Sequence, residues 1–262
     1  MNFKDLGLSD KTIKAIDELG IKEPTTVQAD VIPSILEGKD VFTIAPQGCG
    51  KTMSYVLPLL DIISNKKAQN ILIVTPNSNN SVTVSDQLAI FNRYHIEDEN
   101  ASDEDISSEA NVIIGSPDLL LDVIESGRAN ISSTNILVVD DINLIKKNKQ
   151  LDNLEKILEM LPAEKQNIVY TNRRSKETQS VLEKILKAPE EIKVDKNKEQ
   201  EAQKSACPDA DKQIIKNNHS RQIFSIQDEE ALKIIKKTNA FDGRVPKFIL
   251  IKGILAEDNN SK

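Results

Sequence analysis

The chain has 262 residues, of which 39% are hydrophobic and 29% are charged, as is ordinary for a globular protein. Its net charge of −7 argues against a generally basic surface that binds nucleic acid through the phosphates. A local basic face could still exist within this acidic average. No apolar run approaches the roughly 18 residues that span a bilayer, and the N-terminal segment does not look like a signal peptide. Two distant cysteines, Cys49 and Cys207, form no metal-ligand spacing. We therefore expect a cytoplasmic protein without a membrane partner.

The secondary-structure pattern begins with two helices, at residues 10–20 and 25–38, which end at glycines. Short apolar runs then alternate with helical patterns. The expected strands are residues 40–45, 70–76, 111–117, 135–141 and 167–172. The expected helices are residues 53–65, 84–94, 117–127, 151–161 and 175–187. This alternation predicts an α/β fold with a mostly parallel, doubly wound sheet and helices on both faces.

The regular pattern covers residues 1–195, which we interpret as the first domain. Residues 196–219 are polar, rich in lysine and without a steady period, so we expect a flexible linker. A strand, a helix and a second strand are expected again within residues 220–262. The sequence thus predicts one full domain followed by the beginning of another.

The stretch between Val41 and Leu60 carries the clearest chemistry, because it predicts a strand, a tight turn and a helix. A phosphate-binding loop needs small residues whose backbone N–H groups turn toward the anion, and a helix N-terminus directly after them. It also needs a lysine for the outer phosphates and a hydroxyl for Mg²⁺. Gly48, Gly50, Lys51 and Thr52 supply these in order. A plain glycine turn with a solvated lysine is the alternative.

Two acids follow the apolar run at residues 136–139. We expect Asp140 to hold Mg²⁺ through water, since this ion keeps much of its hydration shell. Asp141 is then placed to orient or deprotonate an attacking water. A polar strand end with a helix cap would give the same pattern without a metal.

These stretches resemble the DEAD-box RNA helicase family. Phe3, followed by "IKEPTTVQ" at residues 21–28, looks like the family's adenine-recognition element, and "APQGCGKT" at 45–52 is similar to its phosphate loop, which begins with alanine. Residues 115–145 resemble the family's course into its metal-binding strand. The likeness covers about residues 3 to 194, the first of two RecA-type domains. Residues 220–262 are more weakly similar to the opening of the second.

The resemblance implies ATP and Mg²⁺ as ligands, with Gln28 reading the adenine edge through its two-sided amide. Gln28 could instead be an ordinary helix-surface glutamine. The implied nucleotide contacts are Phe3, Ile21, Thr25, Gln28, Gln47, Gly48, Cys49, Gly50, Lys51 and Thr52. The implied metal ligands are Thr52 and Asp140, and the implied catalytic residues are Lys51, Asp141 and Thr171.

The sequence also departs from the family pattern at the catalytic motifs. The family's Asp-Glu-Ala-Asp is here the run 140–143, in which Asp141 is one methylene shorter than glutamate. A misplacement of about 1 Å can lower a rate about 100-fold. Asn143 replaces an acid that would link this strand to the coupling motif. In that coupling motif Thr171 retains a hydroxyl, but Asn172 and Arg173 differ.

The RNA-binding motifs differ as well. Residues 77–81 lack the expected Arg and Glu, and Asp118 and Leu119 replace a Gly-Arg pair. An acidic run at 97–109 stands where a glycine pair is expected. Two functions remain open: a slow ATPase of the RNA helicase type that needs a protein partner to complete its cleft, or an inactive ATP-binding or interaction module. We expect weak RNA binding and no autonomous unwinding.

Overall fold

The computed structural model describes residues 2–65, 70–96, 111–194 and 247–250. The strands are β1 Val41–Ile44, β2 Asn70–Val74, β3 Asn111–Gly115, β4 Ile136–Val139, β5 Gln166–Thr171, β6 Glu190–Lys193 and β7 Lys247–Leu250. The helices are the 3-10 helix η1 Phe3–Leu6, then α1 Asp10–Glu18, α2 Thr26–Leu36, α3 Lys51–Ser64, α4 Ser78–Ile96, α5 Pro117–Glu125, α6 Ile142–Lys147, α7 Leu151–Met160 and α8 Lys176–Ile185.

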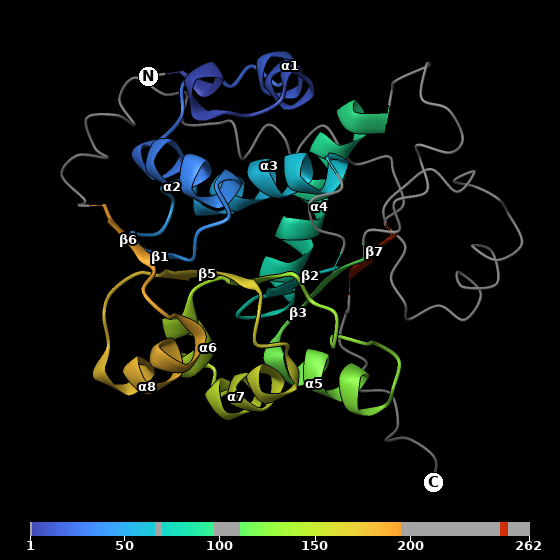
Figure 1. Ribbon diagram of the computed structural model, residues 1–262, viewed down its shortest axis with the longest axis vertical. Coiled ribbons are helices and arrows are strands. Elements are labelled where there is room, and N and C mark those ends of the chain that lie inside the picture. Colours follow the sequence, from blue (N-terminus) through green and yellow to red (C-terminus); the bar gives the residue numbers. More distant parts are fainter. Residues whose placement is uncertain (1, 66–69, 97–110, 195–246, 251–262) are drawn as a thin grey trace, which may run out of the picture.

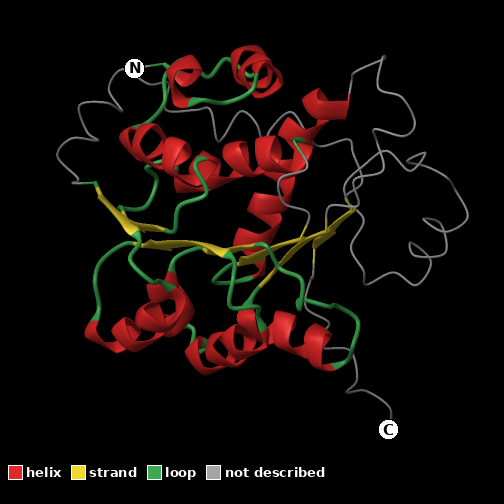
Figure 2. Ribbon diagram, in the orientation of Figure 1, coloured by secondary structure: helices red, strands yellow, loops and turns green. Residues whose placement is uncertain are grey.

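The strands form one sheet in the order β6-β1-β5-β4-β2-β3-β7, and every neighbouring pair is parallel. Helices α1 to α4 cover one face and α5 to α8 cover the other (Figures 1 and 2). Successive strand residues alternate between the two hydrophobic cores: Val41 lies in one and Phe42 in the other. The predicted parallel, doubly wound α/β fold is therefore confirmed.

The N-terminal helices pack over α2, α3 and α4 through a buried carboxylate. Asp61 of α3 accepts hydrogen bonds from the Ser9 backbone amide (2.6 Å), the Ser9 hydroxyl (2.6 Å) and the Thr12 hydroxyl (2.5 Å). Ser9 is the N-cap of α1, so a negative charge lies at the positive end of that helix. The carboxylate therefore joins the start of α1 to α3.

The last described strand, β7, pairs in parallel with β3 at the edge of this same sheet. The sequence placed it in the opening of a second domain. The predicted linker at 196–219 and most of residues 220–262 lie outside the described residues, as does the acidic run at 97–109. The domain division stays a prediction.

Candidate functional site

The carboxyl ends of β1, β4 and β5 lie at one edge of the sheet, where α/β proteins build their sites. The loop after β1 turns through Gly48 (φ +81°) and Gly50 (φ +82°) before α3 begins at Lys51. Backbone conformations of this kind favour glycine. At Gly50 a Cβ would lie 2.5 Å from the Gln28 Nε2 atom, so no other residue fits without a shift.

The Lys51 side chain folds back over the loop after β1. Its ammonium donates to the carbonyl oxygens of Ala45 (3.1 Å) and Pro46 (2.7 Å). The Cys49 thiol donates to the same Pro46 oxygen over 2.9 Å. A phosphate bound here would therefore compete with two carbonyls for the lysine.

A capping box at the start of α2 holds the loop from the other side. The Thr25 hydroxyl donates to the Cys49 carbonyl (2.8 Å) and the Gln28 amide donates to the Gly50 carbonyl (3.3 Å). The Gln28 side-chain oxygen accepts from the Thr25 backbone amide (3.0 Å). Gln28 is only 3% exposed, and one donor and one acceptor position of its amide remain beyond these bonds. Adenine recognition by Gln28 stays a prediction, and bracing of the loop is an observed role.

The other predicted base contacts lie in the same N-terminal layer. Phe3 is 3% exposed within a hydrophobic core, and Ile21 packs against that core. Gln47 is exposed at the tip of the loop. The structure thus joins Thr25 and Gln28 to the loop, whereas the Phe3 ring is almost fully covered by protein.

Asp140 follows β4 directly and is 6% exposed. Burial raises its pKa to about 6, the Lys51 ammonium opposes this rise, and Asp141 adds to it. The Tyr55 hydroxyl donates to Asp140 Oδ2 over a long 3.4 Å. A buried carboxylate that is poorly hydrogen-bonded suits a cation, so Asp140 fits the predicted magnesium ligand.

Tyr55 belongs to a buried tyrosine pair that the sequence analysis missed. The rings of Tyr55 and Tyr170 lie 5.4 Å apart at 52°, and Tyr170 shares a 2.8 Å hydrogen bond with the Ser54 hydroxyl. Burial raises the pKa of Tyr55 and the Thr52 side chain opposes this rise, so the predicted metal-binding hydroxyl acts on the tyrosine that reaches Asp140. The signal in the sequence was two tyrosines within otherwise apolar stretches.

Asp141 is the N-cap of α6 and has a positive φ of 57°. Its Oδ1 atom accepts from the Leu144 backbone amide over 3.2 Å. Burial raises the pKa of Asp141, and the Lys51 ammonium opposes the rise. A strained backbone is common at functional sites. Because the carboxylate also caps a helix, its role toward a water molecule stays a prediction.

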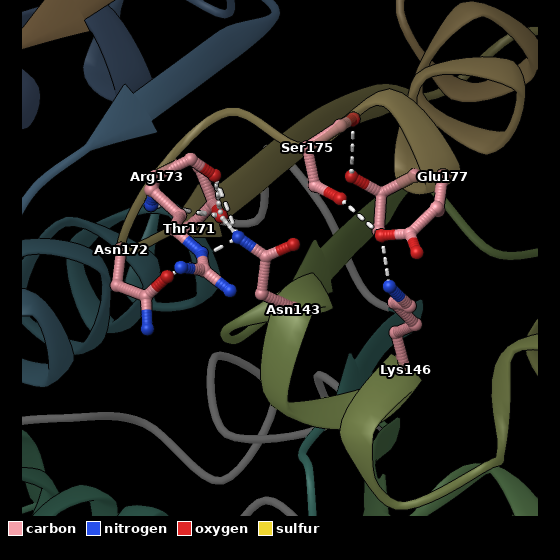
Figure 3. Close-up of polar contacts among 8 residues, drawn as sticks. Asn143, Lys146, Thr171, Asn172, Arg173, Ser175 and Glu177 are labelled. Carbon is pink, nitrogen blue, oxygen red and sulfur yellow. Dashed lines mark hydrogen bonds and ion pairs between the residues drawn. The ribbon is translucent and has the colours of Figure 1, made fainter.

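Asn143 links α6 to the loop after β5 (Figure 3). Its side-chain nitrogen donates to the Thr171 hydroxyl (2.7 Å) and the Arg173 carbonyl (2.6 Å), and lies 3.2 Å from the Asn172 side-chain oxygen. The Thr171 hydroxyl in turn donates to the Arg173 carbonyl over 2.8 Å. The start of α6 and the predicted coupling motif after β5 are therefore joined by the side-chain amide of Asn143.

Two ion pairs flank this link. Lys146 of α6 pairs with Glu177, which also accepts from the Ser175 hydroxyl over 2.9 Å (Figure 3). Arg174 pairs with Glu191 and lies 5.7 Å above the Phe42 ring centroid. Arg174 is thus bound to its own domain.

The loop after β2 is held by internal hydrogen bonds among neutral side chains. The Thr75 and Ser81 hydroxyls lie 2.6 Å apart, and Asn77 Oδ1 accepts from the Asn80 amide over 3.1 Å.

Among the described residues there is no group of three or more His, Cys, Asp or Glu that could hold a metal ion. None of the described helices has the length and apolar character to cross a membrane.

Comparison with known proteins connects this site to a family. The family model described as DEAD/DEAH box helicase matches residues 25–181. The chain is 26% identical over 255 residues to the ATP-dependent RNA helicase DeaD of Haemophilus influenzae, and the match covers 91% of this chain and 41% of that protein. It is 29% identical over 206 residues to DeaD of Buchnera aphidicola subsp. Schizaphis graminum, covering 74% of this chain and 34% of that protein.

Solved structures with a similar fold include proteins of the same family. A DEAD box protein from Methanococcus jannaschii superposes with a TM-score of 0.65 at 25% identity, covering 75% of this chain and 57% of that one. A hypothetical ATP-dependent RNA helicase from Sulfolobus tokodaii gives 0.62 at 25% identity, covering 71% and 57%. The chain thus spans about a third to two fifths of the curated relatives' length. It belongs to the DEAD/DEAH box helicase family.

Proposed function

We propose that this chain is an ATP-binding domain of the DEAD-box RNA helicase type that hydrolyses ATP slowly and does not separate strands by itself. The observation that carries the proposal is the glycine loop after β1, which ends at Lys51 at the start of α3, together with the buried Asp140 at the end of β4. The charge of Lys51 lowers the pKa of Asp140 against the effect of burial. A lysine at the end of a glycine turn and an acid at the end of a neighbouring strand are the parts that hold phosphates and their metal ion.

The roles of the side chains follow from their positions. The loop residues 47–50 and the start of α3 offer backbone N–H groups to the phosphates, and Lys51 leaves Ala45 and Pro46 to meet the outer phosphate. Thr52 and Asp140 would hold Mg²⁺, which supplies neutralisation of the phosphate charge when bound. The adenine base would lie against a group of four residues, Phe3, Ile21, Thr25 and Gln28.

The second candidate function is an inactive, ATP-binding interaction module. Asp141 favours it, because this shortened carboxylate caps α6 through the Leu144 amide. Under this function Asp141 orients no water, and Thr171 serves the link to Asn143 alone. Under the first function, a protein partner that completes the site would raise the slow turnover of the chain.

The test is a titration of the full chain with ATP and Mg²⁺, followed by hydrolysis measurements with and without single-stranded RNA. We expect micromolar to millimolar affinity, of order 4–8 kcal/mol. Lys51→Ala should weaken binding at least tenfold, whereas Lys187→Ala, which removes an exposed lysine elsewhere, should not change it. Equal affinity for ATP and GTP would contradict the role of Gln28. Strong stimulation of turnover by RNA would show that the catalytic motifs function despite their departures.

A further inference from the structure

We propose that Tyr55 is a positioning residue for the predicted metal ligand Asp140: its hydroxyl holds one carboxylate oxygen and leaves the other for Mg²⁺ or for water bound to it. Tyr55 itself contacts neither the metal nor the nucleotide in this role. The inference rests on the proposed function, because it adds a residue to the metal site of that function. The tyrosine is not among the residues that the sequence motifs assign to the site.

The first observation is the contact between Tyr55 and Asp140. The Tyr55 hydroxyl donates to Asp140 Oδ2 over 3.4 Å, and Tyr55 is the only side chain in the described part of the chain that donates a hydrogen bond to this carboxylate. Tyr55 belongs to α3 and Asp140 follows β4, so 85 residues separate the two. A carboxylate that binds a metal is commonly oriented by a hydrogen bond of this kind, from a residue that does not itself bind the metal.

The second observation is that the Tyr55 ring is held in place. Tyr55 is fully buried, and its ring centroid lies 5.4 Å from that of Tyr170. The Tyr170 hydroxyl lies 2.8 Å from the Ser54 hydroxyl, which donates its proton to the Lys51 carbonyl over 2.6 Å. Because a hydroxyl has a single proton, Tyr170 is the donor toward Ser54. The Tyr55 ring therefore packs against a neighbour that is itself bonded to the first turn of α3.

The third observation is that Tyr55 interacts with both predicted metal ligands. Thr52 precedes Tyr55 by three residues in α3, so the two side chains lie on the same face of the helix. The Thr52 side chain also opposes the rise that burial causes in the pKa of Tyr55. One phenol oxygen thus interacts with Thr52 from its own helix and with Asp140 from the end of β4.

Core packing alone does not explain the Tyr55 hydroxyl. A phenylalanine would fill nearly the same space, and burying a phenol oxygen costs free energy unless it is hydrogen-bonded. The Tyr170 hydroxyl has a partner at 2.8 Å, whereas the 3.4 Å bond of Tyr55 is longer than the about 2.5–3.0 Å that is usual between two oxygens. A purely structural role therefore predicts that the Tyr170 hydroxyl matters more than that of Tyr55. A positioning role predicts the reverse for metal binding.

The experiment compares the affinity of the full chain for ATP in Mg²⁺ with its affinity for ATP in EDTA. Tyr55→Phe should reduce the ratio of the two affinities about tenfold, the low end for residues that orient a metal ligand. Its affinity in EDTA should not change, because the hydroxyl does not contact the nucleotide. Tyr170→Phe is the matched control, because it removes a hydroxyl from the same ring pair. It should leave the ratio unchanged and lower the stability toward urea at least as much as Tyr55→Phe does.

A double substitution tests whether Tyr55 acts through Asp140. In an Asp140→Asn background, Tyr55→Phe should have no further effect on the affinity ratio. With Mn²⁺ in place of Mg²⁺, the electron paramagnetic resonance spectrum of the ion bound together with ATP should change in Tyr55→Phe and not in Tyr170→Phe. A general loosening of the core would not produce this difference between the two variants.

The positioning role is overturned if Mg²⁺ strengthens ATP binding equally in the parent and in Tyr55→Phe, or if Tyr170→Phe lowers the affinity ratio as much as Tyr55→Phe does. It is also overturned if Mg²⁺ does not strengthen ATP binding to the parent. Each of these results would leave ATP binding by the domain intact. A parent chain that binds no ATP with or without Mg²⁺ would contradict the proposed function itself, and the role of Tyr55 with it.

Discussion

The Asn143 side chain donates to the Thr171 hydroxyl across 2.7 Å, and that hydroxyl donates onward to the Arg173 carbonyl. An aspartate at this position would only accept. It could bond the hydroxyl in the reverse direction, but the Arg173 carbonyl would then lose both donors. An asparagine at position 143 therefore supplies the hydrogen-bond donors that the Thr171 hydroxyl and the Arg173 carbonyl need.

Asn143→Asp should for this reason destabilise the chain, although it restores the family's acid. The unsatisfied carbonyl and the adjacent new charge predict a loss of about 1–3 kcal/mol. Urea denaturation measures the free energy of unfolding. Asn153→Asp, which adds the same charge in α7, should change it by less than about 0.5 kcal/mol. An Asn143→Asp variant as stable as the parent would contradict the donor assignment.

Asp140→Asn should stabilise the chain at neutral pH. The folded-state pKa of Asp140, about 6, lies above the ordinary 3.8, so the parent loses stability as the pH rises through this interval. Removing the carboxyl should therefore gain up to about 3 kcal/mol at pH 7.5 and little below pH 4. Denaturation in EDTA at both pH values checks this. The exposed Asp17→Asn serves as control, and an equal gain at both pH values would refute the burial argument.

Gly50→Ala should be more harmful than Gly48→Ala. Both residues have a φ near +80°, but a Cβ at Gly50 meets Gln28 and Thr25, whereas a Cβ at Gly48 meets nothing within 4 Å. We expect about 1 kcal/mol of strain at Gly48 and a clear excess at Gly50. Adding Gln28→Ala to Gly50→Ala should recover part of the excess. Equal losses at the two glycines would show that the loop does not touch α2.

Asp61→Ala should loosen α1, because the Ser9 amide and the Ser9 and Thr12 hydroxyls would lose their acceptor. The expected cost is about 2–4 kcal/mol, with faster amide hydrogen exchange in α1 than in α7. The matched change Asp10→Ala, at an exposed position in α1, should cost less than about 1 kcal/mol. Equal exchange rates in α1 and α7 of the Asp61→Ala variant would show that Asp61 does not hold α1.

Much of the fold was predictable from the sequence because fully buried parallel strands appear as short apolar runs. The strands around Val41, Ile71, Val112, Leu137 and Val169 were all expected, and the structure contains them. Helix α6 was not expected: six residues are too few to display a helical period. Helix α4 begins six residues earlier than its apolar pattern, at a run of Asn and Ser residues.

In the candidate site, too, some features were predictable from the sequence and others were not. An acid after an apolar strand and a glycine turn before a helix are local signals, so Asp140 and Lys51 were identified from the sequence. The hydrogen-bond partner of Asn143, Thr171, is 28 residues away, and that of Asn148, Pro76, is 72 residues away. Neither contact could be identified from the sequence. The burial of Gln28 was equally hidden, because a capping box looks the same whether or not it touches another loop.

Under the proposed function, the contact of Lys51 with Ala45 and Pro46 would set a threshold for nucleotide binding. Only molecules in which the ammonium has been released can use it for a phosphate, so the apparent dissociation constant equals the intrinsic one divided by the released fraction. The strength of two carbonyl dipoles thus tunes the nucleotide concentration at which the domain responds. Under the proposed function, a change in the Cys49 side chain, which shares the Pro46 oxygen, would alter that sensitivity.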